Sequence, residues 1–518
     1  MPARFEPCPT LGVDLRAILP AERISQSPAD RLVYSRDLWP KALLSLRDNK
    51  PSVHPPDVVV WPQSTAEVVE IVRLARDRRV PVVAWGGGSG VCGGAMPVSG
   101  GIVVDLKRMN RVLAVSSSDH LATFQVGILG QTLEDQLNLR GLTMGHFPAS
   151  IYISTLGGWL AARSAGQLSS RYGKIEDMVQ GLEVVVGDGR VLQCSDDQSP
   201  NLVPLFVGSE GTLGVITQAT MRVHALPDYR LFRAYEFPRL SAGCEAMRRV
   251  MQAQLRPAVL RLYDEADSIL ARGGRHHEKG HRSLFSLISE LGGDEGGGKG
   301  SDLKQMLMRA ALVRAGSLSK LAERLLPRLS GGCLLIAGFE GEPGLADAEA
   351  ALAHAQLVAA GGRDLGEEPG LAWYDRRYAV SYKQSPVYAS GAFVDTMEVA
   401  TTWDRLMQLY QEVRRALSSL ALVLAHFSHA YPEGCSIYFT FAAAGEGRAR
   451  SDNLYDEIWR RGLSAVLKAG GTISHHHGVG LSKAAFMAEE HGAALGVYRQ
   501  LKAVLDPSGI LNPGKMGL

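Results

Sequence analysis

Cysteine, charge of a single sign and long hydrophobic runs are all scarce in this chain. Its six cysteines are scattered through 518 residues and form no Cys-x-x-Cys pair. That spacing argues against a disulfide framework or a cysteine-rich zinc site, and it favours a reducing compartment. The formal net charge is only +2, without the basic stripe that a nucleic-acid or anionic-membrane partner requires. Any anion-binding site must therefore be a local pocket.

Targeting and membrane signals are lacking as well. No stretch approaches the roughly 18 apolar residues of a membrane-spanning helix. The first residues carry no basic segment followed by an apolar run, and the terminal Gly517-Leu518 is not a peroxisomal address. We therefore expect a cytoplasmic protein with a small-molecule substrate, no nucleic acid and no integral membrane segment, and we leave a homodimer open.

The length predicts two or three cooperating domains, and the pattern of the chain changes along it. Residues 1–52 are typical of a leader with polar and proline breaks. In residues 53–227 a short apolar strand leads to a helix that begins with a capping box at Ser64, and a second strand ends in a glycine run. Residues 228–450 form a second α+β region, and residues 451–518 are a C-terminal segment that holds a histidine run.

The second region contains a glycine-rich run at residues 292–300, which predicts a flexible surface loop. His276, His277 and His281 lie nearby among charged residues. This setting favours a solvated polar face over a metal site.

Three glycine- and hydroxyl-rich segments mark residues 53–227. They are residues 86–94, residues 148–166 and residues 208–216. Glycine lets backbone N–H groups converge on a pyrophosphate without a side chain in the way. A tight turn explains the first segment alone, and a serine-rich loop that caps a helix explains the second alone. Three such segments in this order are hard to explain as unrelated turns.

The histidine run His475-His476-His477 is the most unusual string in the chain. Histidine titrates near neutral pH and therefore suits proton transfer. A metal cluster and a plain polar loop are the alternatives. If the stretch is extended, at most His475 and His477 share a side.

Tyr438 lies in a strand-like run at residues 436–441, where it faces away from Ile437 and Phe439. A lone tyrosine on a strand usually serves packing. Together with the histidine run, Tyr438 becomes a candidate proton donor.

The three segments resemble the FAD-binding domain of the vanillyl-alcohol-oxidase/p-cresol-methylhydroxylase (PCMH) superfamily over residues 55–227, and the string 512–515 (Asn-Pro-Gly-Lys) fits its tail. The resemblance implies an α+β fold with a PCMH-type two-subdomain FAD-binding domain, an α+β cap (substrate) domain and a C-terminal helical segment that returns to the FAD domain. It implies FAD as the cofactor and no metal. The residues that would contact FAD are Gly86, Gly87, Gly88, Ser89, Gly90, Val91, Cys92, Ala149, Ser150, Ile151, Tyr152, Ile153, Ser154, Thr155, Ala162, Arg163, Ser164, Ala165, Glu210, Gly211, Thr212, Leu213, Gly214, Val215 and Ile216.

Some members of this superfamily attach FAD covalently through a histidine in the first glycine loop. Ser89 stands at that position, and serine offers no such bond. Cys92 is nearby, but it is better explained as a small buried residue. We therefore expect FAD to be bound non-covalently.

The histidine run and the Ile-Tyr-Phe string around Tyr438 resemble the alkylglycerone-phosphate synthase branch of the superfamily. This resemblance assigns Tyr438, His475, His476 and His477 to catalysis. The 2-hydroxy-acid dehydrogenases of the superfamily usually have Glu-His-Gly where this chain has His-His-Gly.

One string departs from the synthase pattern. That branch grips the substrate phosphate with an arginine in a Tyr-x-Arg-Asp segment, whereas this chain reads Tyr382-Lys383-Gln384-Ser385. Glutamine offers neither charge nor a bidentate fork, and losing that contact costs ~1.5–3 kcal/mol. Arg376 resembles an arginine that binds the substrate carboxylate in hydroxy-acid members of the superfamily. An equally good explanation is that Arg376 and its neighbour are a basic pair on the surface. We assign Arg376, Gln384 and His429 to the substrate.

Two functions remain. The main hypothesis is an FAD-dependent oxidoreductase of the FAD-linked oxidase family that acts on a small, 2-hydroxy-acid-like substrate, with a base from the histidine run and hydride transfer to flavin N5. The alternative is an alkylglycerone-phosphate synthase. It would exchange the acyl group of acyl-dihydroxyacetone phosphate for a fatty alcohol through a flavin N5 adduct, in ether-lipid synthesis. A flavin-storage protein is disfavoured because it needs no ionisable groups facing the ring.

Overall fold

The computed structural model describes residues 10–48, 55–272, 299–319, 332–379 and 384–518, together with residues 5, 8 and 50. The glycine-rich run predicted as a loop lies outside the described residues, except that its last two residues begin helix α13 (Lys299–Val313). The three histidines at 276, 277 and 281 and the pair Tyr382 and Lys383 also lie outside them.

The chain divides into two compact units. The first comprises Met1–Gly166, Gly173–Leu226 and Ser474–Leu518, and the second comprises Gln167–Tyr172 and Pro227–Ile473. The predicted boundary after residue 450 falls inside helix α19 (Arg448–Lys468). Tyr455 and Trp459 of this helix both donate hydrogen bonds to buried Asp395 of the second unit. The division therefore comes after the helix rather than before it.

The first unit contains a four-stranded sheet in the order β1-β2-β4-β3. Its strands are β1 (Ile24–Ser25), β2 (Val58–Val60), β3 (Val82–Trp85) and β4 (Ile102–Asp105). β2 and β3 both pair with β4 in parallel, and α4 (Thr65–Arg78) connects them, as the sequence predicts. Its N-cap is Ser64, whose hydroxyl accepts the N–H of Glu67. β3 leads directly into the first glycine segment.

Residues 1–52, predicted as a separate leader, belong to the first unit. They supply β1, which pairs antiparallel with β2, and helices α1 (Leu11–Leu15), α2 (Pro28–Val33) and α3 (Pro40–Arg47). Arg23 makes two hydrogen bonds of 2.8 Å to the carboxylate of Glu67 on α4. The two residues of β1 are too few for a strand pattern to show in the sequence.

A five-stranded antiparallel sheet completes this unit, in the order β5-β6-β10-β8-β9. Its strands are β5 (Val112–Ser116), β6 (Leu121–Gln125), β8 (Val179–Val185), β9 (Val191–Ser195) and β10 (Val215–Arg222). The Asp-Gly turn between β8 and β9 uses Gly189 at φ 82°, a value that favours glycine. Helices α5 (Gly130–Asn138) and α6 (Leu156–Ala162), the short helices α8 (Ile175–Met178) and α9 (Val203–Phe206), and the pair β7 (Leu142–Thr143) and β11 (His224–Ala225) make up the rest.

The C-terminal segment returns to the first unit. After α20 (Met487–His491) and α21 (Ala493–Leu505) the tail runs along β3. The N–H of Val82 donates to the carbonyl of Ile510 and the N–H of Asn512 donates to the carbonyl of Val82, both at 2.8 Å. The tail thus continues the first sheet beyond β3.

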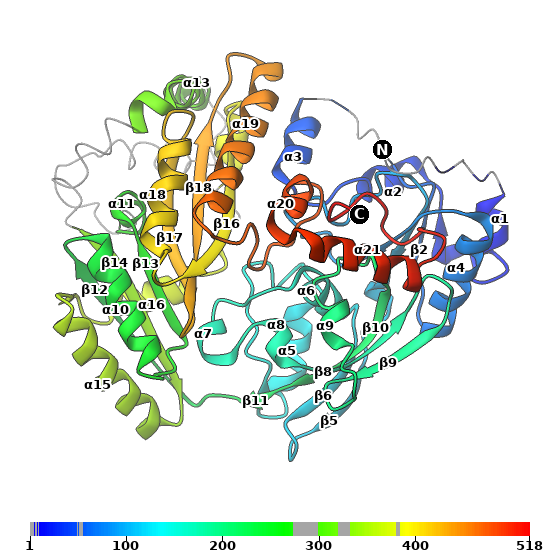
Figure 1. Cartoon of the computed structure of the whole chain (residues 1–518), viewed down its shortest axis with the longest axis horizontal. Coiled ribbons are helices and arrows are strands. Elements are labelled where there is room, and N and C mark those ends of the chain that lie inside the picture. The colour runs from blue at the N-terminus through cyan, green and yellow to red at the C-terminus, as the bar shows by residue number, and fades with distance from the viewer. Residues whose placement is uncertain are drawn as a thin grey trace. The chain divides into compact units, whose positions relative to one another are not determined.

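The second unit is built on one seven-stranded antiparallel sheet in the order β15-β12-β14-β13-β17-β18-β16. Its strands are β12 (Tyr229–Phe237), β13 (Val259–Tyr263), β14 (Cys333–Gly341), β15 (Arg363–Asp364), β16 (Phe393–Thr402), β17 (Leu422–Ala430) and β18 (Gly434–Ala443). Helices α10 (Leu240–Gln252) and α15 (Pro343–Ala359) pack on β12–β14, and α18 (Leu406–Leu417) packs with α19 against β16–β18 (Figure 1). Shorter helices are α7 (Ser169–Tyr172), α11 (Glu265–Arg272), α16 (Glu368–Arg376) and α17 (Ser385–Ala389).

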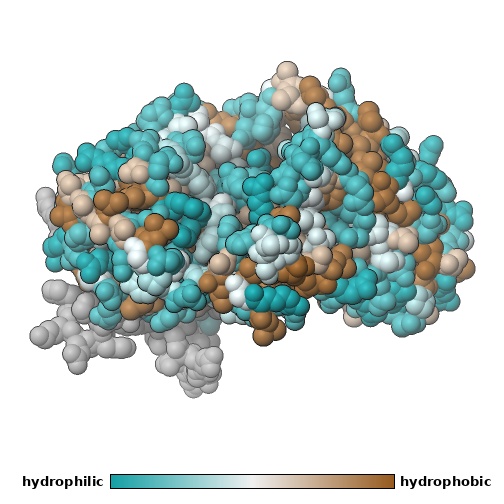
Figure 2. Space-filling model, turned by 90° about the horizontal axis from the view of Figure 1, so that it is seen from below, coloured by the Kyte–Doolittle hydropathy of each residue, from teal (hydrophilic) through white to brown (hydrophobic). Residues whose placement is uncertain are grey.

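Among the described residues, every helix is too short or too polar to cross a membrane. Figure 2 shows hydrophilic side chains over most of the face that it displays, with hydrophobic side chains in smaller groups between them.

Candidate active site

The first and second glycine segments meet in backbone contact. A Cβ added at Gly87 would lie 1.7 Å from the carbonyl oxygen of Ile153, and one added at Gly86 would lie 2.3 Å from Oγ1 of Thr155. Thr155 is the N-cap of α6, where its hydroxyl accepts the N–H of Gly158 at 3.2 Å. Glycine is therefore required at both positions by close packing, and the two segments border one site.

The third segment meets the other end of α6. The N–H of Gly208 donates to the carbonyl of Leu160 and that of Glu210 donates to the carbonyl of Ala161, at 2.8 and 3.0 Å. Gly208 is at φ 84°, and a Cβ there would lie 2.9 Å from the side chain of Arg163. The three segments named from the sequence thus gather around a single two-turn helix.

The residues that follow the histidine run are held in place by contacts with the first and third glycine segments. The carboxylate of Glu210 accepts hydrogen bonds from the N–H groups of Val479 and Gly480. A Cβ on Gly480 would lie 2.2 Å from the carbonyl oxygen of Cys92, and the N–H of Leu481 donates to that carbonyl at 2.8 Å. The histidine run therefore lies next to the glycine segments of the first unit.

The histidine run itself is bent, not extended. The hydroxyl of Ser474 donates to the carbonyl of Gly478 and closes the bend. As a result His475 and His476 are neighbours, with their Nδ1 atoms 3.0 Å apart, and the ring of His477 lies 4.6 Å from that of His476. The expectation that only His475 and His477 share a side is wrong, because it assumed strand geometry.

His146 is a residue of this region that the sequence did not single out. It is completely buried, its Nε2 lies 3.1 Å from Oγ of Ser164, and its ring packs 4.7 Å from that of Trp159. Burial, with a smaller contribution from His476, lowers its pKa to about 3. Its Nδ1 is buried without a hydrogen-bond partner among the described residues, and a buried polar atom of this kind fits a polar group of a bound ligand.

The tail string predicted from residues 512–515 crosses these segments. The side-chain amide of Asn512 donates to the carbonyls of Gly94 and Glu210, at 2.9 and 2.6 Å. Lys515 is fully buried and donates to the carbonyl of Met96 at 2.6 Å. Burial lowers the pKa of Lys515 to about 8, against the attraction of Glu210 and Asp37. The tail therefore carries a buried positive charge into the site of the first unit.

In the second unit, Tyr438 of β18 lies between residues of the two neighbouring strands. It pairs across strands with Glu398 of β16 and His426 of β17, and the ring of His426 stacks on it at 4.6 Å. Nε2 of His429 lies 3.2 Å from its hydroxyl. Burial, followed by the negative charge of Glu398, raises the pKa of Tyr438 well above 10. The phenol therefore keeps its proton at neutral pH, as an unperturbed tyrosine also does.

The two other predicted substrate residues are placed differently. Arg376 is exposed in the last turn of α16, and its Nε donates to the carbonyl of Ala372 in the same helix. Its neighbour Arg377 lies over the ring of Tyr374 at 3.7 Å. Gln384 is half-buried and precedes α17, without a capping hydrogen bond.

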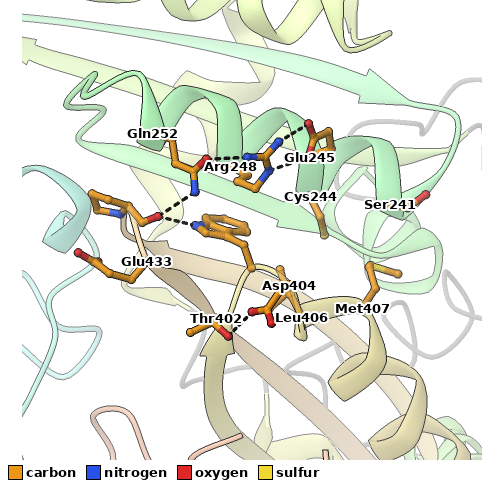
Figure 3. A pocket seen from close by; sticks show the side chains of 12 residues that line it. Ser241, Cys244, Glu245, Arg248, Gln252, Thr402, Asp404, Leu406, Met407 and Glu433 are labelled. Carbon is orange, nitrogen blue, oxygen red and sulfur yellow. Dashed lines mark hydrogen bonds and ion pairs between the residues drawn. The ribbon is translucent and has the colours of Figure 1, made fainter. Parts of the chain in front are cut away.

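A separate hollow of about 570 Å³ lies in the second unit between α10 and the connection from β16 to α18 (Figure 3). Both Gln252 and Trp403 donate hydrogen bonds to the carbonyl of Pro432 at its edge. None of the predicted site residues lines this hollow.

Two family models match the chain. The model described as "FAD binding domain" matches residues 56–195, and the model described as "FAD linked oxidases, C-terminal domain" matches residues 226–516. The second match alone covers more than half of the chain.

Proteins similar to this chain include two synthases. The alkyldihydroxyacetonephosphate synthase of Trypanosoma brucei brucei is 29% identical over 524 residues, which cover 97% of this chain and 80% of that protein. The synthase of Dictyostelium discoideum is 31% identical over 475 residues, which cover 89% and 73%.

Solved structures give the same picture. A structure of alkyldihydroxyacetonephosphate synthase has a TM-score of 0.77 at 28% identity and covers 98% of this chain and 85% of its own. p-Cresol methylhydroxylase with substrate bound has a TM-score of 0.71 at 16% identity, over 98% and 96% of the two chains; this likeness shows the shared fold. The PCMH-type α+β fold and the FAD cofactor expected from the sequence are thereby confirmed. This chain belongs to the family of FAD-linked oxidases, and it is an enzyme of that family with alkyldihydroxyacetonephosphate synthases among its relatives.

Proposed function

We propose that this enzyme is a transferase of the alkylglycerone-phosphate synthase type, which exchanges the acyl group of acyl-dihydroxyacetone phosphate for a fatty alcohol. The observation that carries the proposal is a half-buried Tyr438 whose hydroxyl lies 3.2 Å from Nε2 of His429, in a chain similar over almost its whole length to two such synthases. On the sequence alone this function came second to 2-hydroxy-acid oxidation. The similarity supports the synthase instead.

The residues of the first unit have the role of holding FAD. Backbone N–H groups of the glycine segments suit the pyrophosphate. Nδ1 of His146 offers a buried polar atom that no described residue hydrogen-bonds, while Nε2 of the same ring contacts Ser164. Ser89 at the position of covalent attachment supports non-covalent binding. When bound, FAD supplies an electron-accepting ring. The protein's part is to keep that ring in place and away from water.

The residues of the second unit have the role of moving a proton. The acyl chain leaves as a fatty acid, and a proton delivered to its departing oxygen lowers the barrier to that departure. Tyr438 holds such a proton at neutral pH, as an unperturbed tyrosine does, and burial raises its pKa further. The neighbouring His426 is not suited to the task, since burial and the adjacent Arg261 lower its pKa to about 4.

One residue supports a second candidate function. Gln384 stands where the resemblance implies a phosphate-binding arginine, so a substrate without a phosphate, such as a 2-hydroxy acid, suits this position better. This is the main hypothesis from the sequence, oxidation of a hydroxyl-bearing substrate with a histidine as base.

A single anaerobic experiment separates the two functions. Purified enzyme is mixed with acyl-dihydroxyacetone phosphate and a labelled fatty alcohol, and in parallel with a panel of 2-hydroxy acids. The synthase predicts release of fatty acid, incorporation of label and oxidised flavin at the end. Lasting bleaching of the flavin by a hydroxy acid, without fatty-acid release, would contradict it.

The matched variants are Tyr438→Phe and Thr440→Val. Both residues lie half-buried on the same face of β18, two positions apart, and the hydroxyl of Thr440 contacts that of Thr396 at 3.3 Å. Loss of the acid is expected to lower kcat by ~100-fold or more. The Thr440 variant removes a hydroxyl from the same strand and should leave kcat within about twofold of the unmodified enzyme.

A further inference from the structure

His429 reaches Tyr438 only because the strand that carries it is irregular. His426 lies directly opposite Tyr438, and the pairing of β17 with β18 shifts between Ser428 and Ala430, so that His429 is an extra, bulged residue. In a regular strand His429 would face away from His426, because successive side chains alternate. The bulge and a left-handed backbone at φ 51° turn its ring back to the face of Tyr438.

The two ring nitrogens of His429 connect Tyr438 to a further pair of hydroxyls. Nε2 lies 3.2 Å from the hydroxyl of Tyr438, and Nδ1 lies 2.8 Å from Oγ of Ser169. Oγ of Ser169 in turn lies 3.1 Å from the hydroxyl of Tyr431. Ser169 and His429 are buried, whereas Tyr431 is half-buried. These four groups therefore form a continuous hydrogen-bonded line from Tyr438 to a side chain that solvent reaches.

The other histidine beside Tyr438 does not take part in such a line. Arg261 donates to Nε2 of His426 at 2.6 Å, and Nδ1 of His426 lies 3.1 Å from Asp267. An arginine cannot accept a proton, so His426 is held neutral, with its proton on Nδ1 toward the carboxylate. The charged or titratable groups around Tyr438, besides His429, include His426, its partners Arg261 and Asp267, and Glu398 across the sheet.

Only one direction of the hydrogen bonds leaves the proton of Tyr438 available to a substrate. The hydroxyl of Tyr431 then donates to Ser169, the hydroxyl of Ser169 donates to Nδ1 of His429, and Nε2–H of His429 donates to the oxygen of Tyr438. In this direction the two inner groups, Ser169 and His429, each accept one hydrogen bond and donate one, and His429 is neutral with its proton on Nε2.

From this geometry we propose that Tyr431, Ser169 and His429 form a proton relay that reprotonates Tyr438 after it has given its proton to the substrate. The proton on Nε2 of His429 moves to the tyrosine oxygen, the proton of Ser169 moves to Nδ1, the proton of Tyr431 moves to Ser169, and water restores Tyr431. One proton enters at Tyr431 for each one that leaves Tyr438. The relay rests on the proposed function, in which Tyr438 is the acid; Ser169, Tyr431 and His429 are positioning and relay residues.

The test uses variants that separate orientation from relay. His429→Gln keeps an acceptor for Ser169 and a donor for Tyr438, but an amide does not pass a proton from one end to the other. Ser169→Ala breaks the line one step earlier. Both holoenzyme variants are expected to lower kcat by ~10-fold with little change in KM, which is the rate equivalent of one lost neutral hydrogen bond.

Buffer dependence distinguishes a relay from a structural defect. In the two variants the rate should rise with the concentration of a small buffer such as imidazole, which replaces the missing relay, while the unmodified enzyme should be insensitive to it. Ser268→Ala is the matched control, since Ser268 is a buried serine of the same unit that accepts the N–H of Leu334 at 2.8 Å and donates to the carbonyl of Tyr263. It should show no buffer dependence. Variants at the unmodified rate, or slow variants that ignore buffer, would overturn the relay.

A second measurement does not depend on turnover. In protein labelled with ¹⁵N-histidine, the signal absent from His429→Gln belongs to His429, and it should report a neutral ring protonated on Nε2. Ser169→Ala should change this signal, and a resting ring protonated on Nδ1 would contradict the relay. If the enzyme instead oxidises hydroxy acids and releases no fatty acid, the proposed function is wrong. The histidine signal would still show whether the hydrogen bonds run in the direction that the relay requires.

Discussion

Glu210 and Gly480, far apart in the chain, are joined by a hydrogen bond of 2.8 Å from the glycine N–H to the glutamate carboxylate. Val479 donates to the same carboxylate, and the buried Lys515 and Lys483 are the nearby positive charges. Burial raises the pKa of Glu210, while the two N–H groups and then the lysines oppose that rise. One carboxylate thus ties the third glycine segment to the chain that follows the histidine run.

Replacing Glu210 with glutamine should weaken the first unit. The amide keeps the size of the side chain but loses the charge and turns one end into a donor that faces a backbone N–H. We expect the free energy of unfolding to fall by ~1–3 kcal/mol, and FAD to be retained less well on gel filtration. Unfolding in denaturant measures the first effect, and an unchanged midpoint together with full FAD content would contradict the role given to Glu210.

A side chain at Gly87 should be incompatible with the packing of the first two segments. In Gly87→Ala the new methyl would lie 1.7 Å from a backbone oxygen of the second segment, so one of the two loops must move. The expected result is a folded or partly destabilised protein with little bound FAD. Gly496→Ala is the control, because an added Cβ in α21 meets nothing within 4 Å and alanine favours a helix. Loss of FAD from both variants would show that the effect is not local.

The FAD should come off when the protein is unfolded. Ser89 offers no nitrogen for a covalent bond to the flavin, so acid precipitation should leave a colourless pellet and a yellow supernatant. A pellet that stays yellow after washing would contradict non-covalent binding.

Gln384→Arg should improve binding of a phosphorylated substrate if the enzyme is a synthase. A restored charge-assisted contact is expected to contribute ~1.5–3 kcal/mol, which corresponds to a decrease in KM of about 10- to 100-fold. The measurement is KM for acyl-dihydroxyacetone phosphate, with Gln384→Met as the uncharged comparison. An equal KM in both variants would mean that residue 384 does not meet the phosphate.

His426 should make the protein less stable in acid. Its pKa is lowered to about 4 in the folded protein, whereas an unfolded histidine titrates near ~6.5. As the pH falls from about 6.5 to about 4, only the unfolded chain takes up this proton, so unfolding becomes easier by up to ~3 kcal/mol. Compared at both pH values, His426→Gln should lose less stability than the unmodified protein. An identical loss in both would exclude His426 as the source.

Local patterns were enough to predict much of this molecule. The capped helix after Ser64 and the Asp-Gly hairpin each lie within a few consecutive residues, and the structure places both as expected. The PCMH-type fold and FAD were implied by the resemblance of the three glycine segments to a known superfamily.

The missed features depend on contacts between distant parts of the chain or on irregular backbone. The sequence around Glu210 does not predict its hydrogen bonds with the N–H groups of Val479 and Gly480. The sequence around His146 likewise does not predict its contact with Ser164. The bulge at His429 breaks the alternation on which strand prediction depends. Which residues contact FAD and substrate stays a prediction.

The composition of the first unit has a consequence for how the protein is made. Its sheet is completed by Ile510 and Asn512, and its buried lysine at 515 comes from the same tail, yet the whole of the second unit is translated before them. A ribosome therefore releases a chain whose earliest-made half is still open along one edge. Completion of this unit must wait until residues 510–515 have emerged, so their loss should harm the part of the molecule that was synthesised first.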